Sequence, residues 1–205
     1  VLFPDVTYSF YKVWAELFQV PYETPALDGA FGICPEDYRK ENGGIIFPNP
    51  NAPTGLLLPL DQVEAIVREN RDSIVIVDEA YIDFGGVSAL PLTARYDNLL
   101  VVRTFSKSRS MAGLRIGYAV GDPALIGALQ DVKYSYNSYT MNLPSQILGA
   151  AAVRDEAYFR STVERIIETR EWAKEELGKL GFSFPDSMAN FIFAAHESVP
   201  AAELY

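Results

Sequence analysis

The chain has 205 residues, 49% of them hydrophobic, and a formal net charge of −10. A chain of this length and composition buries a substantial core and folds as one or two globular units. Its 17 Lys and Arg residues are scattered along the chain, so we expect no nucleic-acid partner. No apolar run approaches the roughly 18 to 20 residues that a membrane-spanning helix needs, so we expect no membrane association.

The cysteine content and the first residues of the chain bear on its cellular compartment and on whether it is a fragment. The single cysteine, Cys34, excludes an internal disulfide framework and suits a reducing compartment, so we expect a cytoplasmic protein. The chain starts at Val1 without Met, and its opening "VLFP" is typical of the interior of a strand. We therefore expect a fragment of a longer protein that lacks both ends.

Strands and helices alternate along the first part of the chain. The segment "GGIIFPNPNAPTG" predicts a short strand that ends in a Pro/Asn/Gly loop. In the following "PLDQVEAIVRENR", Val63, Ile66 and Val67 recur at helical spacing. Residues 74–77 and 99–102 are continuous apolar runs, which are typical of strands buried on both faces of a parallel sheet. The order predicts an α/β fold with a mainly parallel sheet.

The second part of the chain is largely helical. "RIGYAVG" predicts one more strand, after which Asp122 and Pro123 are typical of an N-cap and a first helical position. Residues 143–180 predict a helical stretch with an interruption near residues 154–156. After Gly181 the pattern changes, and a second, smaller domain is expected to begin in this part of the chain.

Polar side chains follow the predicted strands where each strand ends. In an open α/β sheet the ligand site lies outside the carboxyl ends of the strands. A partly desolvated lysine at this edge can act as a nucleophile and hold an aldehyde cofactor as a Schiff base. A carboxylate there suits a protonated pyridine nitrogen, and hydroxyl and guanidinium groups suit a phosphate. The residues at these strand ends are Asn49, Asn51, Asp78, Tyr81, Thr104, Ser106, Lys107 and, further along, Arg115.

Three motifs carry a resemblance to a known family. "NPNAPTG", "VDEAYIDF" and "RTFSKSRSMAGLRIGYAVG", in this order and spacing, resemble the signature of fold type I pyridoxal-phosphate aminotransferases. The resemblance extends over essentially the whole chain. It implies a three-layer α/β large domain over residues 1–165 and the start of a small α+β domain over residues 166–205. It also implies a homodimer that builds each site across its interface.

The resemblance assigns a role to each residue of the motifs. It implies that Lys107 is the catalytic Schiff-base lysine, Asp78 the partner of the pyridine nitrogen and Tyr81 the donor to the ring hydroxyl. It implies that Ser106 and Arg115 are phosphate ligands, and that Tyr8 of "DVTYSFY" lies against the cofactor ring. Thr104 is expected beside them as a further hydroxyl donor for the phosphate, because of its chemistry and position. The sequence departs from the family pattern at Ala52, where an asparagine usually contacts the ring hydroxyl. Asn51 or Asn49 is then expected to take over that contact.

The implied function is amino transfer between an amine and a 2-oxo acid. The resemblance points to histidinol phosphate and 2-oxoglutarate as the substrates, a step of histidine biosynthesis. An aromatic aminotransferase and a threonine-phosphate decarboxylase share these motifs, and a non-catalytic effector-binding domain is the alternative from another class. Because part of the pocket would lie outside this chain, we expect residues 1–205 alone to be nearly inactive.

Each candidate also has a plainer interpretation. Taken singly, Lys107 would be a surface lysine, Asp78 a helix cap, and Tyr8 and Tyr81 core aromatics. His196, the only histidine, is not expected to be catalytic. With one His and one Cys, neither a His/Cys metal cluster nor a Ser-His-Asp triad can be assembled. Tyr136 and Asn137, in the segment "YSYNSYTMN", could line a substrate pocket or pack a loop.

Overall fold

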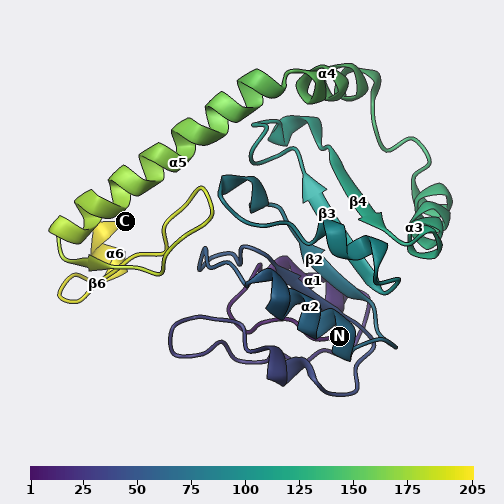
Figure 1. Ribbon diagram of the computed structural model, residues 1–205, viewed down its shortest axis with the longest axis horizontal. Coiled ribbons are helices and arrows are strands. Elements are labelled where there is room, and N and C mark those ends of the chain that lie inside the picture. The colour runs from purple at the N-terminus through teal and green to yellow at the C-terminus, as the bar shows by residue number, and fades with distance from the viewer.

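The computed structural model describes residues 1–205, and a four-stranded sheet forms its centre (Figure 1). The strands are β1 (Ile45–Pro48), β2 (Val75–Asp78), β3 (Leu99–Thr104) and β4 (Gly117–Gly121), and they lie side by side in this order. β1, β2 and β3 are parallel, and β4 runs antiparallel to β3. The predicted α/β class with a mainly parallel sheet is confirmed.

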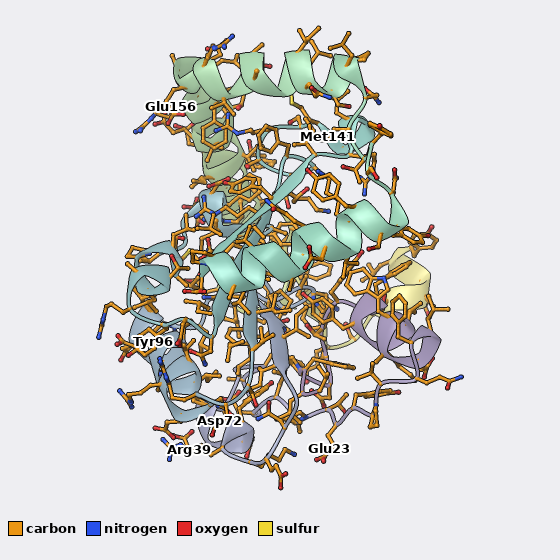
Figure 2. The ribbon with its side chains drawn as sticks, turned by 90° about the vertical axis from the view of Figure 1, so that its right-hand side faces the viewer. Glu23, Arg39, Asp72, Tyr96, Met141 and Glu156 are labelled. Atoms are coloured by element: carbon orange, nitrogen blue, oxygen red, sulfur yellow. The ribbon has the colours of Figure 1, made fainter.

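Helices α2 (Leu60–Glu69) and α1 (Phe10–Leu17) lie on opposite faces of the sheet, as the two views together show (Figures 1 and 2). The α2 face holds the main hydrophobic core, because alternate strand residues and one side of α2 pack together there without exposure to water. The fully buried members from these elements are Ile45, Phe47, Val63, Ile66, Val67, Val75, Val77, Leu99 and Val101.

The face toward α1 is less well covered than the apolar strands predict. Ile46 packs against a small cluster of Phe3, Tyr11 and Ala15, yet it stays half-buried, as does Ile76. The expectation of burial on both faces is therefore correct for the α2 face and only partly correct for the other, where Leu100 of β3 is buried while Ile46 and Ile76 are half-buried. Ile74, which the sequence places in the second strand, lies just outside it and is 42% exposed.

Three helices follow the sheet. α3 (Pro123–Tyr136) begins as predicted, with the amide of Ala124 donating to the side chain of Asp122 at 2.8 Å. α4 (Leu143–Arg154) and α5 (Glu156–Lys179) are separated at Asp155, which caps α5 and confirms the predicted interruption. In Figure 2, Met141 lies in the connection between α3 and α4, and Glu156 lies at the start of α5.

α5 leads to a small C-terminal part, seen in yellow beside its far end in Figure 1. Here β5 (Phe182–Ser183) pairs antiparallel with β6 (Ala195–His196), and α6 (Ala201–Leu204) follows. α5 is continuous across residues 165 and 166, and the division into two domains at this point remains a prediction. Short 3-10 turns occupy Pro35–Tyr38, Ile82–Phe84, Leu90–Ala94 and Ala112–Leu114. None of the helices has the length and apolar character required to span a bilayer.

Candidate active site

A cavity of about 390 Å³ lies at the carboxyl ends of the parallel strands, where the sequence predicts the site. This volume is within the range of small-molecule sites, roughly 300 to 1,000 Å³. Its lining includes every predicted site residue except Asn51 and its alternative, Asn49. The lining residues are Tyr8, Pro48, Ala52, Asp78, Ala80, Tyr81, Val102, Arg103, Thr104, Ser106, Lys107, Ala112 and Arg115.

Asp78 is the last residue of β2 and sits at the base of this cavity. Its Oδ2 accepts a hydrogen bond from the Tyr11 hydroxyl at 2.9 Å, and its Oδ1 accepts one from the amide of Ala80 at 3.1 Å. Burial raises the pKa of Asp78 above its usual range, while these two donors and the charge of Lys107 lower it by a smaller amount. The carboxylate forms no ion pair, so a cation placed beside it would relieve the cost of its burial.

Tyr81 and Lys107 face each other across the cavity. The Lys107 ammonium lies 5.1 Å from the centre of the Tyr81 ring, and Phe191 contacts the same ring edge-on at 5.0 Å. Neither the Tyr81 hydroxyl nor the Lys107 nitrogen has a hydrogen-bond partner within the chain. A nucleophile and a hydroxyl donor are therefore both available to a bound molecule.

A group of donors follows β3. The Thr104 hydroxyl receives the amide of Ser106 at 3.1 Å and lies 2.9 Å from the Ser106 hydroxyl, to which it can donate. The Ser106 hydroxyl hydrogen then remains free for a ligand. Arg115 lines the same cavity, has a left-handed backbone with φ 53°, and binds the carbonyl of Ala112 with one guanidinium nitrogen, which leaves other donors open. Hydroxyl and guanidinium donors together suit a phosphate.

The asparagines of "NPNAPTG" point away from the cavity. The Asn51 amide nitrogen donates to Val6 O and the Thr54 hydroxyl, and its oxygen accepts from Thr7. Asn49 forms a pair of hydrogen bonds with the backbone of Leu58 at 2.8 and 3.0 Å. Both side chains thus stabilise the loop, and Ala52 is the member of the motif that lines the cavity. The predicted contact of Asn51 with a cofactor would require its side chain to leave these partners.

Sequence reasoning missed Tyr11, Arg103 and Glu79. Glu79 has no exposed side-chain surface, and its carboxylate accepts from Ser88, from the amide of Ala89 and from Arg103. Arg103 lines the cavity and ties this carboxylate to the end of β3. A signal existed in the sequence, since Glu79 directly follows Asp78 and Tyr11 belongs to the same "DVTYSFY" segment as Tyr8.

The remaining candidates lie elsewhere. His196 in β6 is 3.1 Å from the carbonyl of Leu180 through Nε2. Tyr136 is 91% exposed at the end of α3. Burial raises the pKa of the Cys34 thiol, which disfavours a reactive thiolate. No three His, Cys, Asp or Glu side chains are grouped closely enough to hold a metal ion.

Comparison with known proteins agrees with this geometry. Residues 1–203 match the model of the aminotransferase class I and II family, and the chain belongs to that family. The chain is 55% identical over 204 residues to the histidinol-phosphate aminotransferase of Pseudomonas putida (strain W619). It is 54% identical over 205 residues to histidinol-phosphate aminotransferase 2 of Dechloromonas aromatica (strain RCB). Both alignments cover 100% of this chain, which spans 59% and 58% of the length of these two relatives.

Solved structures give the same result for the fold. The histidinol-phosphate aminotransferase of Clostridium acetobutylicum superposes with a TM-score of 0.92 at 26% identity, over 100% of this chain and 64% of that one. The enzyme of Sinorhizobium meliloti, solved in complex with pyridoxal-5'-phosphate, superposes with a TM-score of 0.84 at 22% identity, over 97% and 55% of the two chains. The fold is that of the type I aminotransferases, as the sequence motifs predict.

Proposed function

We propose that this chain carries the pyridoxal-phosphate site of an aminotransferase that acts on histidinol phosphate and 2-oxoglutarate. The products would be imidazole acetol phosphate and glutamate, in histidine biosynthesis. One observation carries the proposal: a half-buried carboxylate without an ion-pair partner, Asp78, and a lysine without a hydrogen-bond partner, Lys107, line the same cavity. The identity of about 55% to histidinol-phosphate aminotransferases supports the choice of substrate.

The residues present fit the cofactor. Asp78 would bind the protonated ring nitrogen, which supplies the cation that its half-buried carboxylate lacks. Tyr81 would donate to the ring oxygen, and Tyr8 would lie against the ring face. When bound, the cofactor supplies an electron-withdrawing ring that stabilises negative charge on the substrate carbon. The phosphate would be held by Ser106 and Arg115, and Thr104, whose hydroxyl hydrogen points to Ser106, would take part by orienting the Ser106 hydroxyl.

Lys107 would have two tasks. Its Nζ would hold the cofactor covalently through the aldehyde carbon. As a free amine, it would act as general base and general acid, moving a proton at Nζ to and from the substrate.

We further propose a homodimer in the cytoplasm. α3 contains no buried residue, and the stretch from α3 into α4 exposes large apolar side chains. A surface of this kind is typical of one that another chain covers. The exposed members are Val132, Tyr134, Tyr136, Tyr139, Leu143 and Ile147. The single cysteine suits a reducing compartment.

The test of the proposal is chemical labelling of Lys107. We expect the intact protein that carries this chain to bind pyridoxal phosphate with a visible absorption band. Borohydride reduction should then fix the cofactor on the peptide that contains Lys107, as mass spectrometry would detect. Transamination of histidinol phosphate with 2-oxoglutarate should accompany this binding.

Two lysine variants complete the test. Lys107→Arg should lose the label and the turnover, because no primary amine remains in the cavity. Lys133→Arg, a change on the exposed helix α3, should keep both. A label on Lys133 or on any other lysine would refute the role of Lys107, and turnover with other amines but not histidinol phosphate would refute the substrate.

A further inference from the structure

Tyr11 lies in α1, on the face of the sheet opposite α2, and its hydroxyl contacts Asp78 at the base of the cavity. It lies in the first turns of α1, is 3% exposed, and places its hydroxyl 2.9 Å from Oδ2 of Asp78. The two residues are 67 positions apart in the sequence. Tyr11 does not line the cavity, so it acts on a ligand only through Asp78.

We infer that Tyr11 is a positioning residue that fixes the Asp78 carboxylate as a charged partner for the ring nitrogen of the cofactor. This inference rests on the proposed function. The Tyr11 hydroxyl and the Ala80 amide each bind one carboxylate oxygen, so rotation about the Cβ–Cγ bond of Asp78 would break both hydrogen bonds. The carboxylate is thus held in one orientation before a ligand arrives.

Tyr11 is a permanent donor in this position. Burial, and next the charge of Asp78, raise the pKa of the Tyr11 phenol far above its usual value. The phenol therefore keeps its proton at neutral pH and remains a hydrogen-bond donor. A hydrogen bond to the charged form of Asp78 favours that form and counteracts desolvation, which is the largest influence on this carboxyl. Lys107 acts in the same direction from across the cavity.

The packing of α1 makes the donor rigid. The Tyr11 ring contacts Phe3 edge-on at 6.1 Å, and Ala15 belongs to the same cluster. Tyr11 also contacts the ring of Tyr8 edge-on at 5.5 Å. Because Tyr8 lines the cavity, one side chain supports both the carboxylate and an aromatic wall of the site.

The experiment removes the hydroxyl and measures Asp78 directly. In the cofactor-free intact protein, Tyr11→Phe should raise the titration midpoint of the Asp78 carboxyl by about one pH unit or more, followed by infrared spectroscopy of ¹³C-labelled aspartate. The Asp78→Asn protein assigns the band. Incorporation of 3,5-difluorotyrosine at position 11, which keeps the shape and makes the phenol a stronger donor, should move the midpoint down.

Cofactor affinity provides the second readout. Tyr11→Phe should weaken the binding of pyridoxal phosphate by about tenfold, because a carboxylate that is more easily protonated is a poorer partner for the ring nitrogen. In the Asp78→Asn background the same change should alter Kd by less than about twofold, since the two residues act as one unit. Tyr22→Phe is the matched control, because its hydroxyl donates to the exposed carboxylate of Glu16 at 3.2 Å, and it should change neither quantity.

The outcomes separate this inference from the proposed function. An unchanged Asp78 midpoint in both Tyr11 proteins, or a full tenfold loss of affinity in the Asp78→Asn background, would overturn the role of Tyr11. A parent protein that binds no pyridoxal phosphate would overturn the proposed function. In that case a shifted midpoint would still establish that Tyr11 controls Asp78.

Discussion

At the scale of single residues, burial and hydrogen bonding act in opposite directions on the pKa of Asp78. Asp78 has two hydrogen-bond donors and no ion-pair partner, and desolvation raises its pKa above its usual value near 3.8. Between that usual value and the raised one, the folded chain binds more protons than the unfolded chain. The free energy of unfolding therefore falls as pH rises through this window, and the cost is fully present above the raised pKa.

Asp78→Asn should remove this cost. In the cofactor-free protein, its amide can keep both hydrogen bonds, because Oδ1 accepts from Ala80 while Nδ2 donates to the Tyr11 oxygen. We expect the variant to gain stability relative to the parent as pH rises, by about 1.4 kcal/mol for each unit by which the pKa of Asp78 was raised. Urea unfolding from about pH 4 to about pH 8 measures the difference.

The same substitution should have the opposite effect on the loaded protein. Pyridoxal phosphate should bind more weakly, and turnover should fall by orders of magnitude, because the ring nitrogen loses its charged partner. Asp97→Asn, at an exposed ion pair with Arg71, is the control and should leave both properties unchanged. Near-normal turnover of Asp78→Asn would be inconsistent with the role proposed for this carboxylate.

At the scale of elements, a buried ion pair joins the loops that carry the site. Glu79 begins the loop after β2, and Arg103 lies near the end of β3. Nη2 of Arg103 is 2.8 Å from Oε2 of Glu79, with side-chain exposures of 17% and 0%. Arg103 also lies 3.6 Å from Asp83, further along the first loop. Tyr81 follows Glu79 in the chain, and Lys107 follows Arg103. The Arg103–Glu79 ion pair therefore fixes the spacing between the loops that carry Tyr81 and Lys107.

Removing one partner should cost far more than removing both charges. Arg103→Met leaves the Glu79 carboxylate buried without a cation, and we expect a loss of about 3 to 5 kcal/mol in the free energy of unfolding. In the double variant with Glu79→Gln, which keeps an acceptor for Ser88 and Ala89, at least about 2 kcal/mol should be regained. Arg71→Met, at an exposed ion pair, should cost about 1 kcal/mol or less. Additive losses in the double variant would contradict the pairing.

At this scale, the sequence predicts those features whose cause lies within one element, and it does not predict contacts between residues far apart in the chain. Continuous apolar runs located β2 and β3, and the N-cap at Asp122 located the start of α3, because each signal lies within its own element. The cavity followed from the rule that parallel strands end at one edge. The Tyr11–Asp78 and Arg103–Glu79 contacts could not be predicted in this way, because they join residues 67 and 24 positions apart. The orientation of Asn51 depends likewise on Val6 and Thr7, 45 and 44 positions away.

At the scale of the whole molecule, segment 187–191 connects the C-terminal part to the site. Its Met188 amide donates to the carbonyl of Gly55 at 2.8 Å, and Phe191 supports the Tyr81 ring. The close contact between segment 187–191 and the backbone at Gly55 requires glycine there. Its φ is +75°, and a Cβ atom would lie 2.7 Å from Cβ of Ser187. The loop that begins at Asn49 and the loop that carries Tyr81 are therefore both in contact with the same segment.

Arg170 of α5 joins segment 187–191 to the loop that carries Tyr81. Its guanidinium donates to the carbonyls of Phe84 at 2.8 Å and Ala189 at 3.0 Å, and its side chain is only 6% exposed. It thus links the end of the Tyr81 loop, the long helix and segment 187–191. Both accepting carbonyls would be left without this donor if the guanidinium were removed, at a cost of about 1 to 3 kcal/mol for each buried group.

Arg170→Met keeps the aliphatic stem and removes only the donors, so it should loosen segment 187–191 without unfolding the sheet. We expect amide hydrogen exchange to accelerate by about tenfold or more at Met188 and its neighbours, while β2 and β3 retain their protection. The site should respond as well, because Phe191 no longer holds the Tyr81 ring in one position, and turnover should fall with little change in the fold. Arg160→Met removes an exposed ion pair with Glu156 on the same helix and should change neither exchange nor turnover. Equal exchange at Met188 in the parent and in Arg170→Met would show that packing alone holds the segment. The guanidinium would then have no part in joining the C-terminal strands to the site.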